Sequence, residues 1–236
     1  MGASGGAMLR LAPALFLLFA VPSNAAERRI PVGSFDRVRV NGPVAVIHAP
    51  GSPQARVSGD ARAIEGVVVR VEGSTLTVRA GALGQDEPTQ ASSATPVTVA
   101  LSSPSLVAAA VNAGGRFDAA RVRGGRVDLM VTGPGTITVA DLTADQLSAT
   151  LIGTGAMTLA GRAGRVRLST NGSGRIDASG LRSDDLAVAL DGPGETLATA
   201  RYGAVVNNLG LGTVTVTGRP KCTVTARAGG PVRCGD

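Results

Sequence analysis

Residues 147–174 read LSATLIGTGAMTLAGRAGRVRLSTNGSG and contain two copies of one pattern, an alternating apolar segment that ends in Gly-x-Gly. The pattern recurs from residue 105 almost to the C-terminus. Its second glycines follow one another at nearly constant intervals, with Gly114-Gly115 in place of Gly-x-Gly at the first turn: Gly115, Gly135, Gly155, Gly174, Gly194 and Gly212. Repetition at a fixed period of this length is typical of solenoid proteins.

The apolar residues keep the same register as the glycines. Leu147, Ala149 and Leu151 alternate before one turn, and Met157 and Leu159 follow it. A third apolar position comes later, after most of the glycine turns. Alternation at period two means that one face of each strand is buried. Three short segments in every repeat predict a right-handed, three-sided parallel β-helix with about six rungs of about 20 residues each. A β-propeller or a β-sandwich is the rival fold, but a propeller blade needs about 40 residues, so one repeat would be only half a blade.

The glycines that punctuate the repeat are predicted to be structural. Each supplies either a positive φ or a close backbone approach between rungs. Short polar residues precede the first glycine of several turns and are suited to hydrogen-bonding the turn or stacking as a ladder: Asn112, Thr132, Asn171 and Asp191. Ile152 interrupts that column.

The first third of the chain lacks the regular repeat. Alternating segments predict strands at residues 35–40, 44–47, 55–58, 67–71, 76–79 and 97–101, with a polar surface loop at residues 84–96. An open rung would expose strand edges, so a solenoid needs a terminal cap. We therefore expect residues 26–104 to be the start of the same solenoid, an N-terminal β cap with hairpins, and residues 105–236 to form the Gly-x-Gly rungs.

The N-terminus predicts export. Residues 9–21 form an apolar run that has the length of a signal peptide and is too short to cross a bilayer. Ser23 and Ala25 are the small residues that a signal peptidase reads, which places cleavage after Ala25, with Ala26 as the alternative. The start is Met1 or Met8. A single mature domain, residues 26–236, is expected in the periplasm or outside the cell, and no later stretch could span a membrane.

Two cysteines, Cys222 and Cys234, lie near the C-terminus. An even number in an exported chain predicts one disulfide, which would fasten the last rung. A metal site is the alternative interpretation, but the sole histidine, His48, is distant in sequence.

The layout resembles the head GIN domain family, whose name describes auto-transporter adhesins. The resemblance begins with Phe35-Asp36-Arg37-Val38-Arg39-Val40-Asn41-Gly42 and continues through residues 67–79 and 96–106. It then covers the Gly-x-Gly rungs, of which Asn171-Gly172-Ser173-Gly174 is nearest to the Ser-Gly-Ser-Gly of the family, and Gly218-Arg219-Pro220. The resemblance implies an adhesin-like domain of unknown function with the same fold.

Catalytic signatures are sparse. The adjacent carboxylates Asp184 and Asp185 are expected at a solvated corner beside Arg182, and His48 is expected to be a surface or core residue. Two segments, residues 114–118 and 124–128, are similar to a calcium-binding repeat but lack its third glycine and its period of nine. No catalytic, cofactor-binding or metal-binding residue is assigned.

The net charge of +6 comes from arginines that look scattered along the sequence. With aromatics at only 2%, stacking on nucleic acid is not expected. The leading hypothesis is an exported, non-enzymatic binding or structural module of the cell envelope, its ligand open among a glycan, a lipid head group and a protein. A β-helix enzyme acting on polysaccharides, and a self-assembling structural protein, are the alternatives.

Overall fold

The computed structural model describes Gly2, residues 26–80 and residues 97–235. The predicted signal peptide and the predicted loop at residues 84–96 lie outside these ranges. Within them, the chain forms strands and one short helix, α1 (Ala61–Glu65). The strands are β1 Ala26–Ile30, β2 Arg37–Asn41, β3 Ala45–Pro50, β4 Gln54–Gly59, β5 Val67–Glu72, β6 Thr75–Ala80, β7 Thr98–Ser103, β8 Ala108–Asn112, β9 Arg116–Ala119, β10 Val122–Thr132, β11 Thr136–Ile152, β12 Ala156–Asn171, β13 Arg175–Asp191, β14 Glu195–Asn208, β15 Thr213–Gly218, β16 Lys221–Ala226 and β17 Val232–Cys234.

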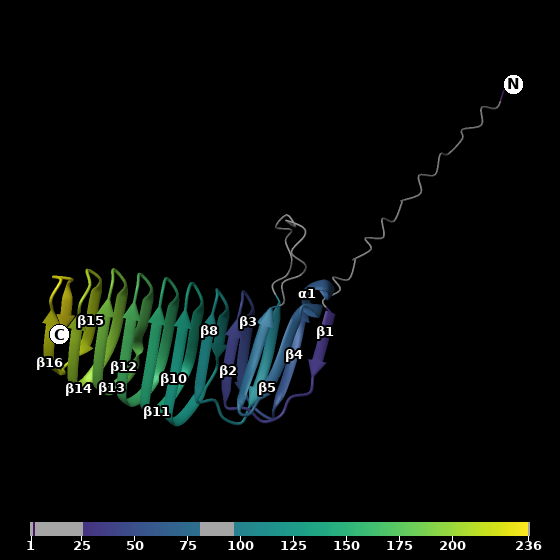
Figure 1. Cartoon of the computed structure of the whole chain (residues 1–236), viewed down its shortest axis with the longest axis horizontal. Helices are drawn as coiled ribbons and strands as arrows, with labels where there is room; N and C mark the ends of the chain where they lie inside the picture. The colour runs from purple at the N-terminus through teal and green to yellow at the C-terminus, as the bar shows by residue number, and fades with distance from the viewer. Residues whose placement is uncertain (1, 3–25, 81–96, 236) are drawn as a thin grey trace.

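The strands from β8 onward stack in parallel as the rungs of an elongated prism (Figure 1). Residues 136–139, 142–144 and 146–152 of β11 each pair with β12, so one long strand bends along three sides of the coil. The predicted β-helix fold is confirmed, with about six turns of roughly 20 residues each. The only described helix, α1, has five residues, and none in the described ranges is long and apolar enough to cross a membrane.

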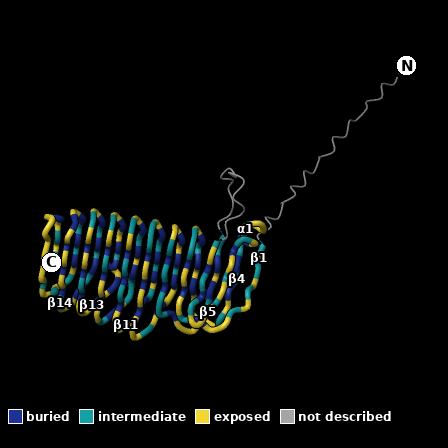
Figure 2. The backbone as a smooth tube through the Cα atoms, viewed as in Figure 1, coloured by how far each residue is buried: buried dark blue, intermediate teal, exposed yellow. Residues whose placement is uncertain are grey.

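The core is a set of columns that run along the prism axis. Buried residues alternate with more exposed ones along the strands, as the dark blue bands in Figure 2 show. In one column Leu147, Val166, Leu186 and Ala204 are in register on successive rungs. Most of the inward residues are alanine, valine, leucine or isoleucine, and Phe117 and Met157 are among the largest fully buried side chains. Each coil is too thin to bury its own inner face, so burial depends on stacking.

The two glycines of each Gly-x-Gly corner have different tasks. The first adopts a positive φ at the corners from Gly133 to Gly192, for example 88° at Gly133 and 119° at Gly172, a region that residues with a Cβ rarely adopt; Gly210 is the exception. The second packs against the rung before it. A Cβ on Gly194 would lie 2.5 Å from the carbonyl oxygen of Gly174 and 2.8 Å from that of Gly172. These neighbours are backbone atoms, which cannot rotate away.

The polar residues before the glycines form only part of the expected ladder. The side chain of Asn112 donates to Asn41 Oδ1 over 3.0 Å, which joins two neighbouring rungs. Asn171 and Asp191 are exposed instead. The ladder is therefore confined, within the described residues, to the N-terminal rungs.

The N-terminal region does not stack in sequence order. The rung made by β2 and β3 lies between the β6/β7 rung on one side and the β8/β9 rung on the other. Beyond β7, β4 and β1 add antiparallel strands, and β5 forms an antiparallel hairpin with β6. The six predicted strands correspond to β2–β7, whereas β1 and α1 were not predicted.

This order requires the chain to cross over the β2/β3 rung after β7, and His48 lies beneath that crossover. His48 is 1% exposed, and its Nε2 is 2.9 Å from the Ser103 hydroxyl oxygen. The Ser103 hydroxyl donates to the carbonyl of Ser105 over 2.7 Å, so its oxygen accepts from a protonated Nε2. Burial lowers the pKa of His48 to about 4, which keeps the ring neutral at physiological pH.

The other end of the prism carries the disulfide. Cys222 and Cys234 are bonded to each other and link β16 to β17. They close the turn of the final rung, where β16 is largely exposed.

Replacement of Gly194 by alanine is expected to lower the free energy of unfolding by about 2 kcal/mol, because the new methyl group must displace backbone of the preceding rung. The matched control is Gly125→Ala, whose Cβ would meet only the Asp145 carboxylate at 3.5 Å. It should stay within about 0.5 kcal/mol of the wild type. Urea unfolding followed by circular dichroism measures both, and equal effects would contradict the close-packing role of the second glycine.

Acid is expected to weaken the fold through His48. The unfolded chain binds a proton at this residue near its ordinary pKa of 6.5, and the folded chain only near 4. The unfolded state therefore holds more protons in this window, and stability falls as pH drops from 6.5 to 4, by about 3 kcal/mol in total. Urea unfolding across this range should show a shallower decline for His48→Gln than for the wild type, and parallel curves would refute the assignment.

Candidate functional site

Two grooves run across the rungs on adjacent sides of the prism. The first, called here the basic groove, has a volume of about 740 Å³ and is lined by residues 143–145, 162–164, 182–184, 199–201 and 218–219. The second, the corner groove, has a volume of about 560 Å³ and is lined by residues 126, 146–148, 165–167, 185–187 and 205. The boundary between them falls between consecutive residues, such as Asp184 and Asp185. Several rungs therefore contribute neighbouring residues to both grooves, on either side of one bend in the strand.

The floor of the basic groove is made of small side chains. Ala144, Ala163, Ser183 and Ala200 are in register on successive rungs, and all four are buried. The neighbouring column carries leucine and valine at most of the same rungs. The floor is therefore made of small side chains, and the groove above it crosses five rungs.

Each of four consecutive rungs places one arginine in the basic groove. The four are exposed, and none forms an ion pair with a carboxylate of the described residues: Arg162, Arg182, Arg201 and Arg219. Register pairing sets Arg162 beside Arg182. The guanidinium of Arg201 lies 4.6 Å from the ring centroid of Tyr202, which is 56% exposed. These cations can therefore meet an anionic ligand without first breaking an ion pair to the described part of the chain.

Two carboxylates share the basic groove with the arginines. Asp145 and Asp184 both line it, two rungs apart, with Gly164 at the equivalent place between them. Asp185, next in sequence, lines the corner groove instead. The adjacent Asp184–Asp185 pair is exposed at a corner of the coil, as the sequence indicated, and its two side chains serve different surfaces.

The corner groove is charged in a different way. It holds Arg165 and Arg167 on one rung, Asp185 on the next, and Arg126. Arg126 forms an ion pair with Asp128, with its Nε 3.2 Å from a carboxylate oxygen. Only part of its charge is therefore available to a ligand.

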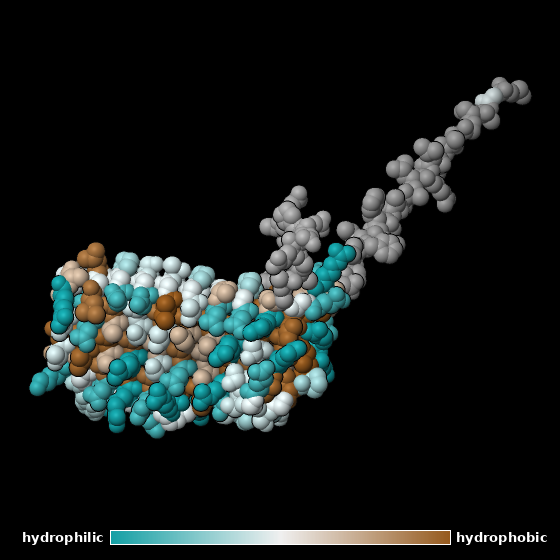
Figure 3. Space-filling model, in the orientation of Figure 1, coloured by the Kyte–Doolittle hydropathy of each residue, from teal (hydrophilic) through white to brown (hydrophobic). Residues whose placement is uncertain are grey.

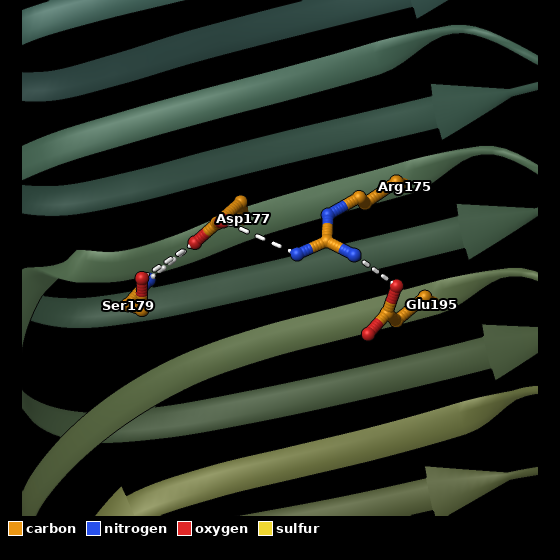
Figure 4. Close-up of polar contacts among 4 residues, drawn as sticks. All are labelled: Arg175, Asp177, Ser179 and Glu195. Carbon is orange, nitrogen blue, oxygen red and sulfur yellow. Dashed lines mark hydrogen bonds and ion pairs between the residues drawn. The ribbon is translucent and has the colours of Figure 1, made fainter.

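On the side of the prism that begins after the Gly-x-Gly turns, the charged side chains of β9, β13 and β14 pair with one another. Figure 4 shows Arg175 reaching both Asp177 and Glu195 on the next rung, with Ser179 bonded to Asp177. The 2.6 Å hydrogen bond from the Ser179 hydroxyl, aided by Arg175, lowers the pKa of the Asp177 carboxyl. On an earlier rung Asp118 raises the pKa of Arg116, first through a side-chain hydrogen bond. Charges that satisfy one another leave little for a ligand.

The other residues singled out in the sequence, in the calcium-like segments and at His48, have structural roles. Asp118 and Asp128, from the calcium-like segments, are paired with Arg116 and Arg126 rather than converging. Within the described residues no three metal-ligating side chains come together. His48 is sealed in the core beneath the crossover, away from both grooves.

The prediction that the arginines are scattered was wrong for the basic groove. Residues 162, 182, 201 and 219 recur at nearly constant intervals, which follow the period of the glycine repeat. That spacing was the sequence signal that could have revealed the basic groove. It is imperfect because Arg182 pairs with Thr199, so Arg201 lies two residues further along its rung than Arg162 and Arg182 do on theirs.

Exposed apolar side chains do not dominate the surface. On the face seen in Figure 3, hydrophilic and hydrophobic groups are interspersed across the rungs. The larger exposed ones include Tyr202, Val205, Leu209, Leu211 and Val224, on the C-terminal rungs.

Known structures with this fold include several bacterial proteins. A "putative adhesin" from Bacteroides fragilis has a TM-score of 0.79 and 17% identity, covering 91% of this chain and 98% of its own. A "putative adhesin" from Parabacteroides distasonis has a TM-score of 0.66 and 21% identity, covering 89% and 96%. A "putative lipid binding protein" from the same species has a TM-score of 0.68 and 19% identity, covering 91% and 95%. At these identities the likeness shows the fold alone.

The sequence matches no curated protein. The family described as "Putative auto-transporter adhesin, head GIN domain" matches residues 34–220, which include the β2/β3 rung, the crossover and all the Gly-x-Gly corners. The resemblance seen in the sequence is thereby confirmed, and the chain belongs to the head GIN domain family.

Proposed function

We propose that this protein is an exported, non-enzymatic binding module of the cell envelope that acts in an adhesin-like way. The observation that carries the proposal is the basic groove, a solvent-open channel in which four rungs each present an arginine that no carboxylate of the described residues pairs. A rigid β-solenoid holds such groups at fixed spacing without ordering a flexible loop, which reduces the entropic cost of binding.

The family name and the names of structural relatives support an adhesin-like role. Export rests on the apolar segment at residues 9–21 and on the disulfide between Cys222 and Cys234, which suits an oxidising compartment. Contact with a macromolecule along several rungs would use the lateral surface of the prism, since its sides are far longer than its ends (Figure 1).

A polysaccharide-cleaving β-helix enzyme is the second candidate, because Asp145 and Asp184 face one groove. Glycosidases need paired carboxylates, one of them a general acid held in an environment that favours its protonated form. The surroundings of Asp145 and Asp184 are arginines and small side chains without an apolar enclosure. That setting suits binding better than acid catalysis.

The purified protein is expected to co-sediment with envelope fragments from a Gram-negative bacterium, and to be released progressively by salt as its exposed arginines are screened. An unrelated basic protein of similar size and net charge serves as the control. Retention of the protein no stronger than that of the control would contradict the proposed function. Release of reducing ends from envelope polysaccharide, lost in Asp145→Asn or Asp184→Asn, would favour the enzyme instead.

A further inference from the structure

We propose that the basic groove binds an acidic polysaccharide, laid along the solenoid axis, through Arg162, Arg182, Arg201 and Arg219. This inference deepens the proposed function and rests on it for the binding role. It adds the site, the direction of the ligand and the chemical class of the ligand.

The spacing of the cations favours an extended polyanion. Adjacent rungs of a β-sheet are about 4.8 Å apart, so four rungs set four guanidinium groups along roughly 15 Å. The groove floor of small residues leaves space for a chain to lie between these groups. A linear acidic polysaccharide carries a carboxylate or sulfate on successive sugar units, a repeat similar to the rung spacing. A planar guanidinium can donate two parallel hydrogen bonds to such an anion.

The two carboxylates in the groove narrow the class of polyanion. Asp145 and Asp184 would repel a ligand that is anionic throughout and offers no hydrogen-bond donors along its backbone, such as polyphosphate. A polysaccharide alternates anionic groups with hydroxyls, which can donate to these carboxylates. The groove therefore matches a ligand that is acidic and rich in hydroxyl groups.

Nucleic acid and membrane surfaces fit this groove less well. Single-stranded nucleic acid is held by successive aromatic platforms, whereas the described residues place only Tyr202 at the edge of the groove. A bilayer presents a flat surface of head groups, which would engage the protruding parts of the prism rather than a hollow. An elongated polymer is the occupant that fits a channel crossing five rungs.

The test uses polygalacturonate, a soluble uronic acid polymer, immobilised for interferometry at low ionic strength, with neutral dextran as the reference surface. The groove variant replaces Arg162, Arg182, Arg201 and Arg219 by glutamine. The matched control replaces four exposed cations that line neither groove, Arg62, Lys221, Arg227 and Arg233, by glutamine and so loses the same net charge. Circular dichroism verifies the fold, and the half variants Arg162→Gln/Arg182→Gln and Arg201→Gln/Arg219→Gln replace the groove variant if it misfolds.

Support requires that the wild type binds polygalacturonate but not dextran, that the groove variant raises Kd about ten-fold or more, and that the control variant stays within about three-fold. Equal losses in both variants would overturn the proposal, since net charge alone would explain binding. Failure of the wild type to bind the polymer would also overturn it.

Two further readouts separate this inference from the proposed function. If the protein co-sediments with envelope fragments but ignores polygalacturonate, the binding function stands and the ligand class is wrong. If vesicles containing phosphatidylglycerol are bound through the same four arginines while the polymer is not, a lipid head group is the ligand and the polysaccharide is excluded. Binding of the polymer without envelope co-sedimentation would support the groove and contradict the envelope role.

Discussion

The close approach of backbone at the Gly-x-Gly corners is the contact on which the rest of this structure depends. The amide of Gly174 donates to the carbonyl of Gly153 over 2.9 Å, and that of Gly212 to Gly192 over 2.9 Å. These bonds fix each rung against the one before it. A Cβ at these positions would collide with the rung before, at 2.6 Å from the carbonyl oxygen of Gly155 for Gly174 and closer still to that of Gly194 for Gly212. The corner thereby sets the register of every column, whether of buried aliphatics or of exposed charges.

Register at the corner also explains the grooves. Each rung returns to the same corner after one repeat, so a residue type that recurs with the period of the glycines forms a line along the prism. Small residues at one position create the floor of the basic groove, and arginines at neighbouring positions create its charge. The rungs that carry Arg175, Asp177 and Glu195 pair their charges internally on another side. The fold thus distributes satisfied and unsatisfied charges to different sides of one prism.

The N-terminal rungs follow a different rule. The β2/β3 rung finds both of its neighbours in later sequence, β6/β7 on one side and β8/β9 on the other. It is completed only after the chain has crossed over it, and the buried His48 and Ser103 hold that crossing. Because loops that close over long sequence separations are slow to form, this end is expected to be assembled later than the locally paired rungs. The rungs whose neighbours are farthest apart in sequence therefore lie next to the antiparallel strands β1 and β4 at the N-terminal end.

The sequence by itself determined the fold class, the period, the inward columns and the family, because the glycine spacing and the alternation of apolar residues are local consequences of rung geometry. Six strands of the N-terminal region were also evident from alternation. Only the tertiary structure decided the order of the first rungs. Their strands all show the same alternation of apolar residues, so the sequence alone does not indicate which strand pairs with which. Only the stacking gathered four arginines, one from each of four successive repeats, into one groove, because a charge has no partner or surface until its rung has neighbours.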